Sequence, residues 1–348
     1  MRIAVMGAGS IGTIVGALIT KSGRDVVLID IDEKNVAALN AEGATITGFL
    51  KLNVPVKAIT PAQMSGNYDV VLLTTKQTYN DAALKQLLPY LADESTVCTL
   101  QNGIPEESVA SYIGAERTTG GTTGFGATWL EPGVSELTST VAVLEKYALD
   151  IGDLKGRITP RLKKVQEVLS AVGGTTIVEN FMGVRWAKLL MNATFSGMSA
   201  ALNCTFTDVL ANAEAMLVLA HIADETIKVA HACRYRLAEI QGVDMEFLEL
   251  QPGQTPQDKM EFYRRVWGQH PNKASMLQDL EKGCKTEINH INGHVASKGR
   301  QKNIPTPCND FVVKVVTAAE NQRKFPDFQT NLEIARRTLL AMKAAGKS

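Results

Sequence analysis

The chain has 348 residues, of which 45% are hydrophobic and 21% charged, so it can bury a sizeable core and is not an intrinsically disordered protein. Its 36 basic and 36 acidic residues give no formal net charge, which argues against nucleic acid or an anionic membrane as its main partner. No run of about 18 apolar residues occurs, and an apolar strand starts at once, so we expect neither a membrane span nor a signal peptide. The five cysteines are scattered, so we expect a cytoplasmic protein with free thiols.

Residues 1–180 alternate short apolar runs with helical stretches, which predicts a parallel sheet with right-handed crossovers. We expect strands at 2–6, 25–30, 69–75, 96–100 and 116–121, and helices at 10–22, 33–41, 79–90 and 104–113. The segment 121–152 is typical of an antiparallel excursion. A helix at 159–172 and a strand at 174–179 complete this part of the chain.

From residue 179 the pattern is helical to the end of the sequence. We expect helices at 182–201, 207–234, 257–268, 275–299, 306–321 and 328–344. The predicted fold class is therefore α/β, with an N-terminal Rossmann-type doubly wound sheet over residues 1–180 and an all-α C-terminal domain over residues 181–348. A cleft between these two domains is the expected place for a ligand.

The sequence begins with a dinucleotide-binding fingerprint. An apolar strand leads directly into Gly7, Gly9 and Gly12. Gly7 permits the tight turn, Gly9 lets the backbone approach a pyrophosphate, and Gly12 lets the helix pack close to the strand. The helix that starts at Ser10 and Ile11 then offers unbonded N–H groups to the phosphates. The alternative is a glycine-rich turn that binds no ligand.

The second expected strand ends in an acid, Asp30, which is followed by Ile31 and Asp32. A carboxylate here accepts hydrogen bonds from the ribose hydroxyls and repels a 2′-phosphate, so it favours NAD over NADP. An NADP enzyme usually has an arginine at the place of Ile31. The alternative role for Asp30 is to cap the next helix, with Asp32 as its competitor.

Two further strands end in residues that can reach a ligand. Lys76 follows one and Asn102 follows the other. Because ligands of open α/β sheets lie beyond the carboxyl ends of the strands, we expect both side chains to face the cofactor. The alternative is that Lys76 begins a solvated loop and that Asn102 belongs to an ordinary turn.

The helix expected over 182–201 is apolar almost all round, apart from a narrow stripe of Lys188, Asn192 and Ser196. Residues four apart share one helix face, and polar groups inside a buried helix are costly without partners. A lysine there has its charged form disfavoured, so it is a candidate proton donor near neutral pH. The alternative is a lysine whose amine extends to the surface.

A second polar cluster covers residues 272–293. Ser275 could cap a helix, with Gln278 completing a capping box, and Glu287 could be an ordinary acid on a surface helix. His290 and His294 are four residues apart, but no further acid stands at metal-binding spacing, so we expect no metal site.

Taken together, these segments resemble the ketopantoate reductase (2-dehydropantoate 2-reductase) family over nearly the whole chain. The motifs that carry the resemblance are GAGSIG at 7–12, TTK at 74–76, QNG at 101–103, WAKLLMN at 186–192 and SMLQDLEKGCKTEINHINGHV at 275–295. The resemblance implies NAD(P)H-dependent reduction of a branched or bulky 2-keto acid to a 2-hydroxy acid, as in pantothenate biosynthesis. It also implies that the active site lies between a Rossmann domain and a helical domain.

By the same resemblance, Lys188 matches the catalytic lysine and proton donor, and Glu287 the active-site glutamate. The positions that match residues around the nicotinamide and the substrate are Lys76, Asn102, Asn192 and Ser275. The segment 240–270 is longer than the family minimum, and we expect it to cover the cleft.

The sequence departs from the family pattern at two places. Members that use NADPH usually have a small residue where Asp30 stands and an arginine where Ile31 stands, so NADH is favoured here, with NADP(H) left open by the resemblance. Ketopantoate-specific members carry a second asparagine where Ser196 stands, which leaves the substrate open.

Alternatives remain at this stage. One is an NAD-dependent D-2-hydroxyacid dehydrogenase of the same family, and others are a dehydrogenase of the opine or β-hydroxyacid type and a non-catalytic NAD(H)-binding protein. The expected partners are a small 2-keto acid and a second copy of the chain in a homodimer, with neither nucleic acid nor membrane.

Overall fold

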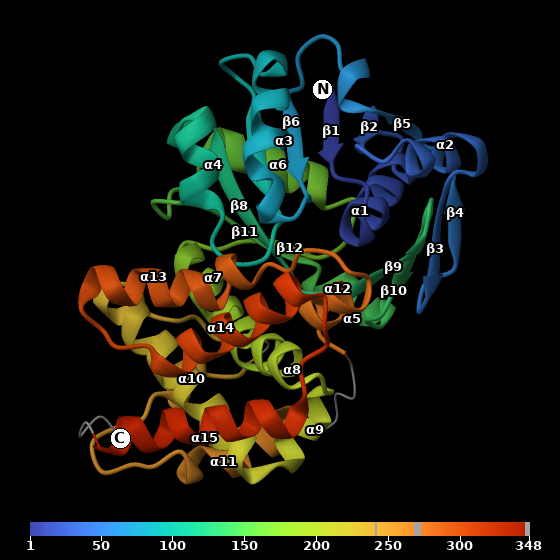
Figure 1. Ribbon diagram of the computed structural model, residues 1–348. Coiled ribbons are helices and arrows are strands. Elements are labelled where there is room, and N and C mark those ends of the chain that lie inside the picture. Colours follow the sequence, from blue (N-terminus) through green and yellow to red (C-terminus); the bar gives the residue numbers. More distant parts are fainter. Residues whose placement is uncertain (241, 268–272, 345–348) are drawn as a thin grey trace. The chain divides into compact units, whose positions relative to one another are not determined.

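The computed structural model describes residues 1–240, 242–267 and 273–344. It separates into two units, Met1–Met182 and Gly183–Ser348. The first is built on a mixed sheet with helices and the second is helical, so the predicted fold class is confirmed (Figure 1). None of the helices within the described ranges combines the length and the apolar character that a bilayer crossing needs.

An eight-stranded sheet, in the order β12-β11-β8-β7-β6-β1-β2-β5, forms the centre of the first unit (Figure 1). Its strands are β1 (Ile3–Met6), β2 (Val26–Ile29), β5 (Lys57–Ile59), β6 (Val70–Leu73), β7 (Thr96–Thr99), β8 (Thr118–Thr123), β11 (Leu149–Asp153) and β12 (Thr175–Ile177). The six strands from β5 to β8 are parallel, in the doubly wound order, and β11 runs antiparallel to β8. The strand order reverses between β1 and β6, which is where such sheets bind ligands.

The strands of this sheet are apolar on both faces because helices cover both. In β1, Ile3 and Val5 join one buried cluster while Ala4 and Met6 join the other, as the two-residue period of a strand requires. The first cluster includes α1 (Ser10–Lys21), α2 (Glu33–Glu42) and α6 (Pro160–Leu169). The second includes α3 (Asn80–Leu87) and α4 (Glu106–Ile113).

A second sheet, in the order β4-β3-β10-β9, lies in the same unit. It consists of β3 (Ala44–Gly48), β4 (Leu52–Val54), β9 (Ala127–Glu131) and β10 (Val134–Leu137), and α5 (Val141–Tyr147) follows it. The predicted antiparallel excursion is confirmed by the β9–β10 hairpin. Its parallel partner β3 was not predicted, because β3 and β10 lie far apart in the sequence and both are short.

The second unit is a helical bundle around α10 (Ala213–Ala232), against which α13, α14 and α15 pack. Its other helices are α7 (Phe181–Met191), α8 (Gly197–Leu202), α9 (Phe206–Ala211), α11 (Gln257–Trp267), α12 (Ser275–Glu281), α13 (Asn292–Lys302), α14 (Pro307–Gln322) and α15 (Phe328–Ala344). A π-helical turn, Asn192–Ser196, joins α7 to α8.

Two predicted long helices are wrong in their extent. The helix expected over 207–234 is divided at Asn212, whose side chain accepts hydrogen bonds from the N–H groups of Glu214 and Ala215 in the first turn of α10. The helix expected over 275–299 stops after α12, where Gly283 has a φ of 66°, a left-handed conformation that ends helices. A 3-10 turn, Ile288–His290, then precedes α13.

Candidate active site

The carboxyl ends of β1, β6 and β7 meet around the glycine loop. Thr74 Oγ1, at the end of β6, donates to the Gly7 carbonyl oxygen over 2.6 Å. Gly7 has a φ of 102° and its missing Cβ would lie 2.8 Å from the Thr75 nitrogen, so a side chain is excluded by both conformation and space. At Gly12 a Cβ would lie 1.8 Å from the Gly7 oxygen, so this glycine is needed for α1 to pack against the turn.

The start of α1 fits a phosphate-bearing ligand. Gly9 is its N-cap and makes no side-chain hydrogen bond, and a Cβ built on Gly9 would meet nothing within 4 Å. The first turn at Ser10 and Ile11 thus has no N-cap side chain bonded to its N–H groups, the space beside Gly9 is open, and the helix dipole is positive at this end. These are the features that a dinucleotide pyrophosphate requires.

Asp30 lies beside this loop and does not cap α2. Its Oδ2 accepts from the Ala8 N–H over 2.7 Å and its Oδ1 accepts from the Asp32 N–H over 2.9 Å. The cap of α2 is Asp32, which accepts from the Lys34 N–H. The next residue, Ile31, is uncharged and 79% exposed, so it cannot bind a 2′-phosphate as an arginine would.

The loop is also tied to the β9–β10 hairpin. The buried Asn35 donates to the Ala8 carbonyl oxygen over 3.0 Å and accepts from the Gly133 N–H over 2.8 Å. Ser135 Oγ donates to the Ser10 carbonyl oxygen over 2.8 Å. The second sheet therefore supports the cofactor loop, a function that the sequence analysis missed because nothing in the local pattern marks Asn35 or Ser135.

Lys76 and Asn102 follow neighbouring strands, and their loops are joined by glutamines. Gln101 Nε2 donates to the Thr75 carbonyl oxygen over 2.7 Å, and Gln77 Nε2 donates to the Asn102 carbonyl oxygen over 2.5 Å. Lys76 and Asn102 are both half-buried. The two predicted residues thus lie on adjacent loops that are fixed to each other, at the same edge as Gly7.

In the second unit, Lys188 is half-buried in the last turn of α7. Burial lowers the pKa of the Lys188 amine from its usual value, and the nearby positive charge of Arg185 lowers the pKa further. Both causes act in the direction that makes a lysine a better proton donor near neutral pH.

The other two residues of the polar stripe lie in the π-helical turn. The side-chain nitrogen of Asn192 is buried, and it has no hydrogen-bond partner among the residues that the structure describes. Ser196 is buried. An unsatisfied buried amide is costly, so Asn192 is suited to bind an acceptor group that a ligand brings.

Glu287 is 7% exposed and immediately precedes the 3-10 turn, so it is not an acid on a surface helix. Glu320 of α14 accepts from both the N–H and the hydroxyl of Thr286, over 2.6 and 2.5 Å, which fixes the loop beside Glu287. Ser275 is exposed at the first position of α12, where the N-cap is Ala274, so the predicted capping box is wrong.

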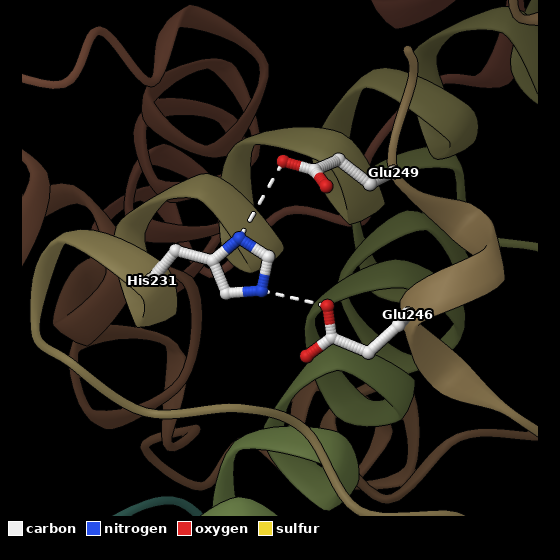
Figure 2. Close-up of side chains that lie close together, drawn as sticks. All are labelled: His231, Glu246 and Glu249. Carbon is white, nitrogen blue, oxygen red and sulfur yellow. Dashed lines mark hydrogen bonds and ion pairs between the residues drawn. The ribbon is translucent and has the colours of Figure 1, made fainter.

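A cluster that the sequence analysis missed consists of His231, Glu246 and Glu249, as Figure 2 shows. Glu246 is 2.6 Å from Nε2 of the imidazole and Glu249 is 3.5 Å from Nδ1, so the carboxylates lie at different ring nitrogens. One metal ion can contact only one ring nitrogen. Glu246 also accepts from the Leu237 N–H, so the geometry favours a hydrogen-bonded brace that holds the segment after α10. No sequence spacing marks this cluster.

A cavity of about 950 Å³ lies within the second unit. It is lined by parts of α10, α14 and α15 and by residues 249–257. None of the predicted site residues lines it. This part of the 240–270 segment therefore covers a cavity of its own unit.

Comparison with known proteins agrees with these features. The family description "Ketopantoate reductase PanE/ApbA" matches residues 3–148, and "Ketopantoate reductase PanE/ApbA C terminal" matches residues 180–320. The chain is 32% identical to a 2-dehydropantoate 2-reductase of Pyrococcus horikoshii over 323 residues, which is 92% of this chain and 98% of that protein.

Solved structures share the fold. One is a 2-dehydropantoate 2-reductase from Geobacter metallireducens GS-15, with a TM-score of 0.76, 26% identity and coverage of 92% of this chain and 100% of that one. Another is D-mandelate dehydrogenase with NADH and anilino(oxo)acetate, with a TM-score of 0.79, 23% identity and coverage of 93% and 99%. The chain therefore belongs to the ketopantoate reductase family and is an NAD(P)-dependent oxidoreductase.

Proposed function

We propose that this enzyme reduces a branched or bulky 2-keto acid to the 2-hydroxy acid, with NADH as the preferred reductant. The observation that carries the proposal is the pair formed by Lys188 and Asn192. One is an amine whose pKa is lowered by burial, and the other, one turn away, is a buried amide donor without a partner among the described residues. A proton donor beside an unsatisfied hydrogen-bond donor suits a ketone that carries a carboxylate.

The first unit supplies the cofactor set. Gly7, Gly9 and Gly12 shape the loop, and the N–H groups at Ser10 and Ile11 bind the pyrophosphate. Asp30 accepts from the ribose hydroxyls, and the absence of a cation at Ile31 supports NADH over NADPH. When bound, the reduced nicotinamide supplies the hydride. Lys76 and Asn102 orient the nicotinamide end and the substrate.

The second unit supplies the substrate set. Asn192, Ser196 and Ser275 donate hydrogen bonds to the substrate carboxylate. Lys188 stabilises the negative charge that develops on the keto oxygen and gives it a proton. Glu287 orients the substrate or the lysine. These groups align and polarise the ketone, while the redox chemistry belongs to the cofactor.

The nature of the substrate side chain is the second part of the proposal. Ketopantoate is the first candidate because curated relatives carry the name 2-dehydropantoate 2-reductase. An NAD-dependent D-2-hydroxyacid dehydrogenase is the alternative, and Ser196 supports it because a hydroxyl leaves more room than the asparagine of ketopantoate-specific members.

An initial-rate screen tests both parts. NADH and NADPH are compared with ketopantoate, 2-ketoisovalerate, 2-ketoisocaproate and phenylglyoxylate as substrates. Reduction of at least one of these acids, faster with NADH, is the expected result. Nucleotide binding without turnover of any acid in the panel would instead favour a non-catalytic NAD(H)-binding protein. Faster turnover with NADPH than with NADH would refute the proposed cofactor preference.

We also propose that the enzyme is a homodimer in the cytoplasm. None of the five cysteines, all of which lie among the described residues, forms a disulfide, which is compatible with a reducing compartment. Sedimentation velocity at micromolar concentration tests the dimer, because a single species at the monomer mass contradicts it.

A further inference from the structure

The π-helical turn between α7 and α8 leaves one backbone carbonyl without its usual donor. In an α-helix, the N–H of Gly197 would bond to the oxygen of Ala193, four residues earlier. Here the Gly197 N–H donates to the oxygens of Asn192 and Thr194 instead. The Ala193 oxygen therefore does not receive the Gly197 N–H, and a buried carbonyl without a donor is costly.

Asn292, in the first turn of α13, provides that donor. Its Nδ2 lies 3.0 Å from the Ala193 oxygen and 3.0 Å from Oδ1 of Asn309. Asn309 in turn donates to Glu225 over 2.7 Å, and Glu225 also accepts from the N–H groups of Cys308 and Asn309. A line of buried polar groups thus connects the π turn to the start of α14 and to α10.

The missing side chain of Gly197 leaves room for the Asn292 amide beside the π turn. A Cβ on Gly197 would lie 2.7 Å from Oδ1 and 3.1 Å from Nδ2 of Asn292, closer than ordinary contacts allow. Asn292 is completely buried, as is Asn309. The amide of Asn292 can therefore reach Ala193 only because position 197 carries no side chain.

The π turn changes the angle around the helix axis between Lys188 and Ser196, the two ends of the polar stripe. In an uninterrupted α-helix, residues four apart advance about 40° beyond one full turn, so Lys188 and Ser196 would differ by about 80°. A π turn bonds i to i+5 and takes more residues per turn, which cancels part of this advance. The turn thus brings Ser196 back toward the face that presents Lys188 and Asn192.

We propose that Asn292 is a positioning residue, which stabilises the π turn through the Ala193 oxygen and so aligns Asn192 and Ser196 with Lys188 for the 2-keto acid. This inference rests on the proposed function, since it assigns a purpose to the stripe. Asn292 itself does not contact the substrate in this proposal.

The test compares two buried asparagines, each of which donates a hydrogen bond to a backbone carbonyl oxygen of the same helical segment. Asn292→Leu removes the donor to Ala193, and Asn331→Leu removes a matching donor, since Asn331 Nδ2 bonds to the Ala201 oxygen at the end of the same helical segment over 2.9 Å. Both variants lose one buried hydrogen bond to a backbone oxygen, and Asn292→Leu also loses the one to Asn309. Only Ala193 belongs to the π turn.

Steady-state kinetics with the best 2-keto acid provide the first readout. In Asn292→Leu we expect kcat to fall by about 10²-fold, the effect of misplacing reacting groups by about 1 Å, with a raised KM for the 2-keto acid and an unchanged KM for NADH. In Asn331→Leu these constants should stay at the wild-type values. Equal losses in the two variants would reduce Asn292 to a structural role and overturn the proposal.

Hydrogen exchange of the apoprotein gives a second readout that needs no turnover. We expect faster exchange of the amides of residues 193–198 in Asn292→Leu but not in Asn331→Leu. If the wild type reduces no 2-keto acid, the proposed function fails while this exchange result still reports on the turn. Unchanged exchange in folded Asn292→Leu would overturn the proposal even if the enzyme is active.

If Asn292→Leu does not fold, Gly197→Ala replaces it. The added methyl group displaces the Asn292 amide without deleting it. The same loss of kcat and the same faster exchange are expected, and a fully active Gly197→Ala with wild-type exchange would refute the role of Asn292.

Discussion

Asp30 Oδ2 accepts a hydrogen bond from the Ala8 N–H at 2.7 Å, so the carboxylate that ends β2 holds the glycine loop that follows β1. The same carboxylate is the proposed ribose acceptor. One side chain therefore holds the loop and, in our proposal, also favours NADH over NADPH.

Asp30→Ala should weaken NADH binding and reduce the discrimination against NADPH, because both the ribose acceptor and the repulsion of a 2′-phosphate are lost. We expect Kd for NADH to rise about tenfold, which is about 1.4 kcal/mol. Asp32→Ala is the control. It removes the cap of α2 and about 1 kcal/mol of stability, and its NADH affinity should stay unchanged. Fluorescence titration measures both, and equal loss of affinity in the two variants contradicts the assignment.

Alanine substitutions at Gly9 and Gly12 should have different effects, the first on NADH affinity and the second on stability. Gly9→Ala adds a methyl group where the protein leaves open space, so the thermal midpoint should be unchanged while NADH affinity falls, because the methyl occupies the approach of the pyrophosphate. Gly12→Ala drives a methyl group into the Gly7 oxygen and should cost about 1–3 kcal/mol of stability. Wild-type NADH affinity in Gly9→Ala would show that no nucleotide approaches there.

Lys188→Ala should lower kcat by about 10²–10⁴-fold, the range for loss of a positioned acid, while NADH still binds. Lys188→Arg keeps the positive charge but gives up its proton far less readily, so it should recover little turnover. In the wild type, reduction should slow as the pH rises through the lowered pKa of Lys188, since the donor must be protonated. Unimpaired turnover of Lys188→Ala would refute the assignment.

Glu225 should make the stability of the second unit depend on pH. Its side chain is 4% exposed, and burial raises its pKa from 4.5 to about 7, with the negative charge of Asp224 adding to the rise. Because the folded state binds this proton more tightly than the unfolded state, the free energy of unfolding should fall between about pH 4.5 and 7 by about 3 kcal/mol.

Urea unfolding at pH 5 and pH 8 measures the effect, with Glu225→Gln as the control. The variant cannot titrate at this position, so the difference between the two pH values should shrink by about the same 3 kcal/mol. An identical pH dependence in both proteins would mean that the carboxyl group is charged throughout.

Much of the first unit could be predicted because its strands and helices obey simple periods. Buried parallel strands are apolar throughout, and Gly7, Gly9 and Gly12 mark the turn after β1 by their missing side chains. The second sheet could not be predicted, since β3 and β10 are short and gain their stability from a partner far away in the sequence. The breaks at Asn212 and Gly283 are single-residue events inside helical patterns.

For the site, the sequence points to the groups that we propose for the chemistry but not to the residues that hold them in place. Lys188, Asn192 and Ser196 share a four-residue spacing, which is visible in the sequence. The π turn is not visible, because it depends on Asn292 reaching across the bundle. The alternative role of Ser275 as a helix cap, which local spacing alone suggests, is wrong because the residue before it is the N-cap.

Trp129 is the single tryptophan of the first unit. It pairs across the β9–β10 hairpin with Ser135, whose hydroxyl group bonds to the Ser10 carbonyl oxygen at the start of α1. An indole is therefore coupled through one strand pair and one hydrogen bond to the loop that takes the pyrophosphate. We therefore expect the emission of Trp129 to change when a nucleotide binds, above the emission of Trp186 and Trp267 in the second unit, so binding can be followed without any label.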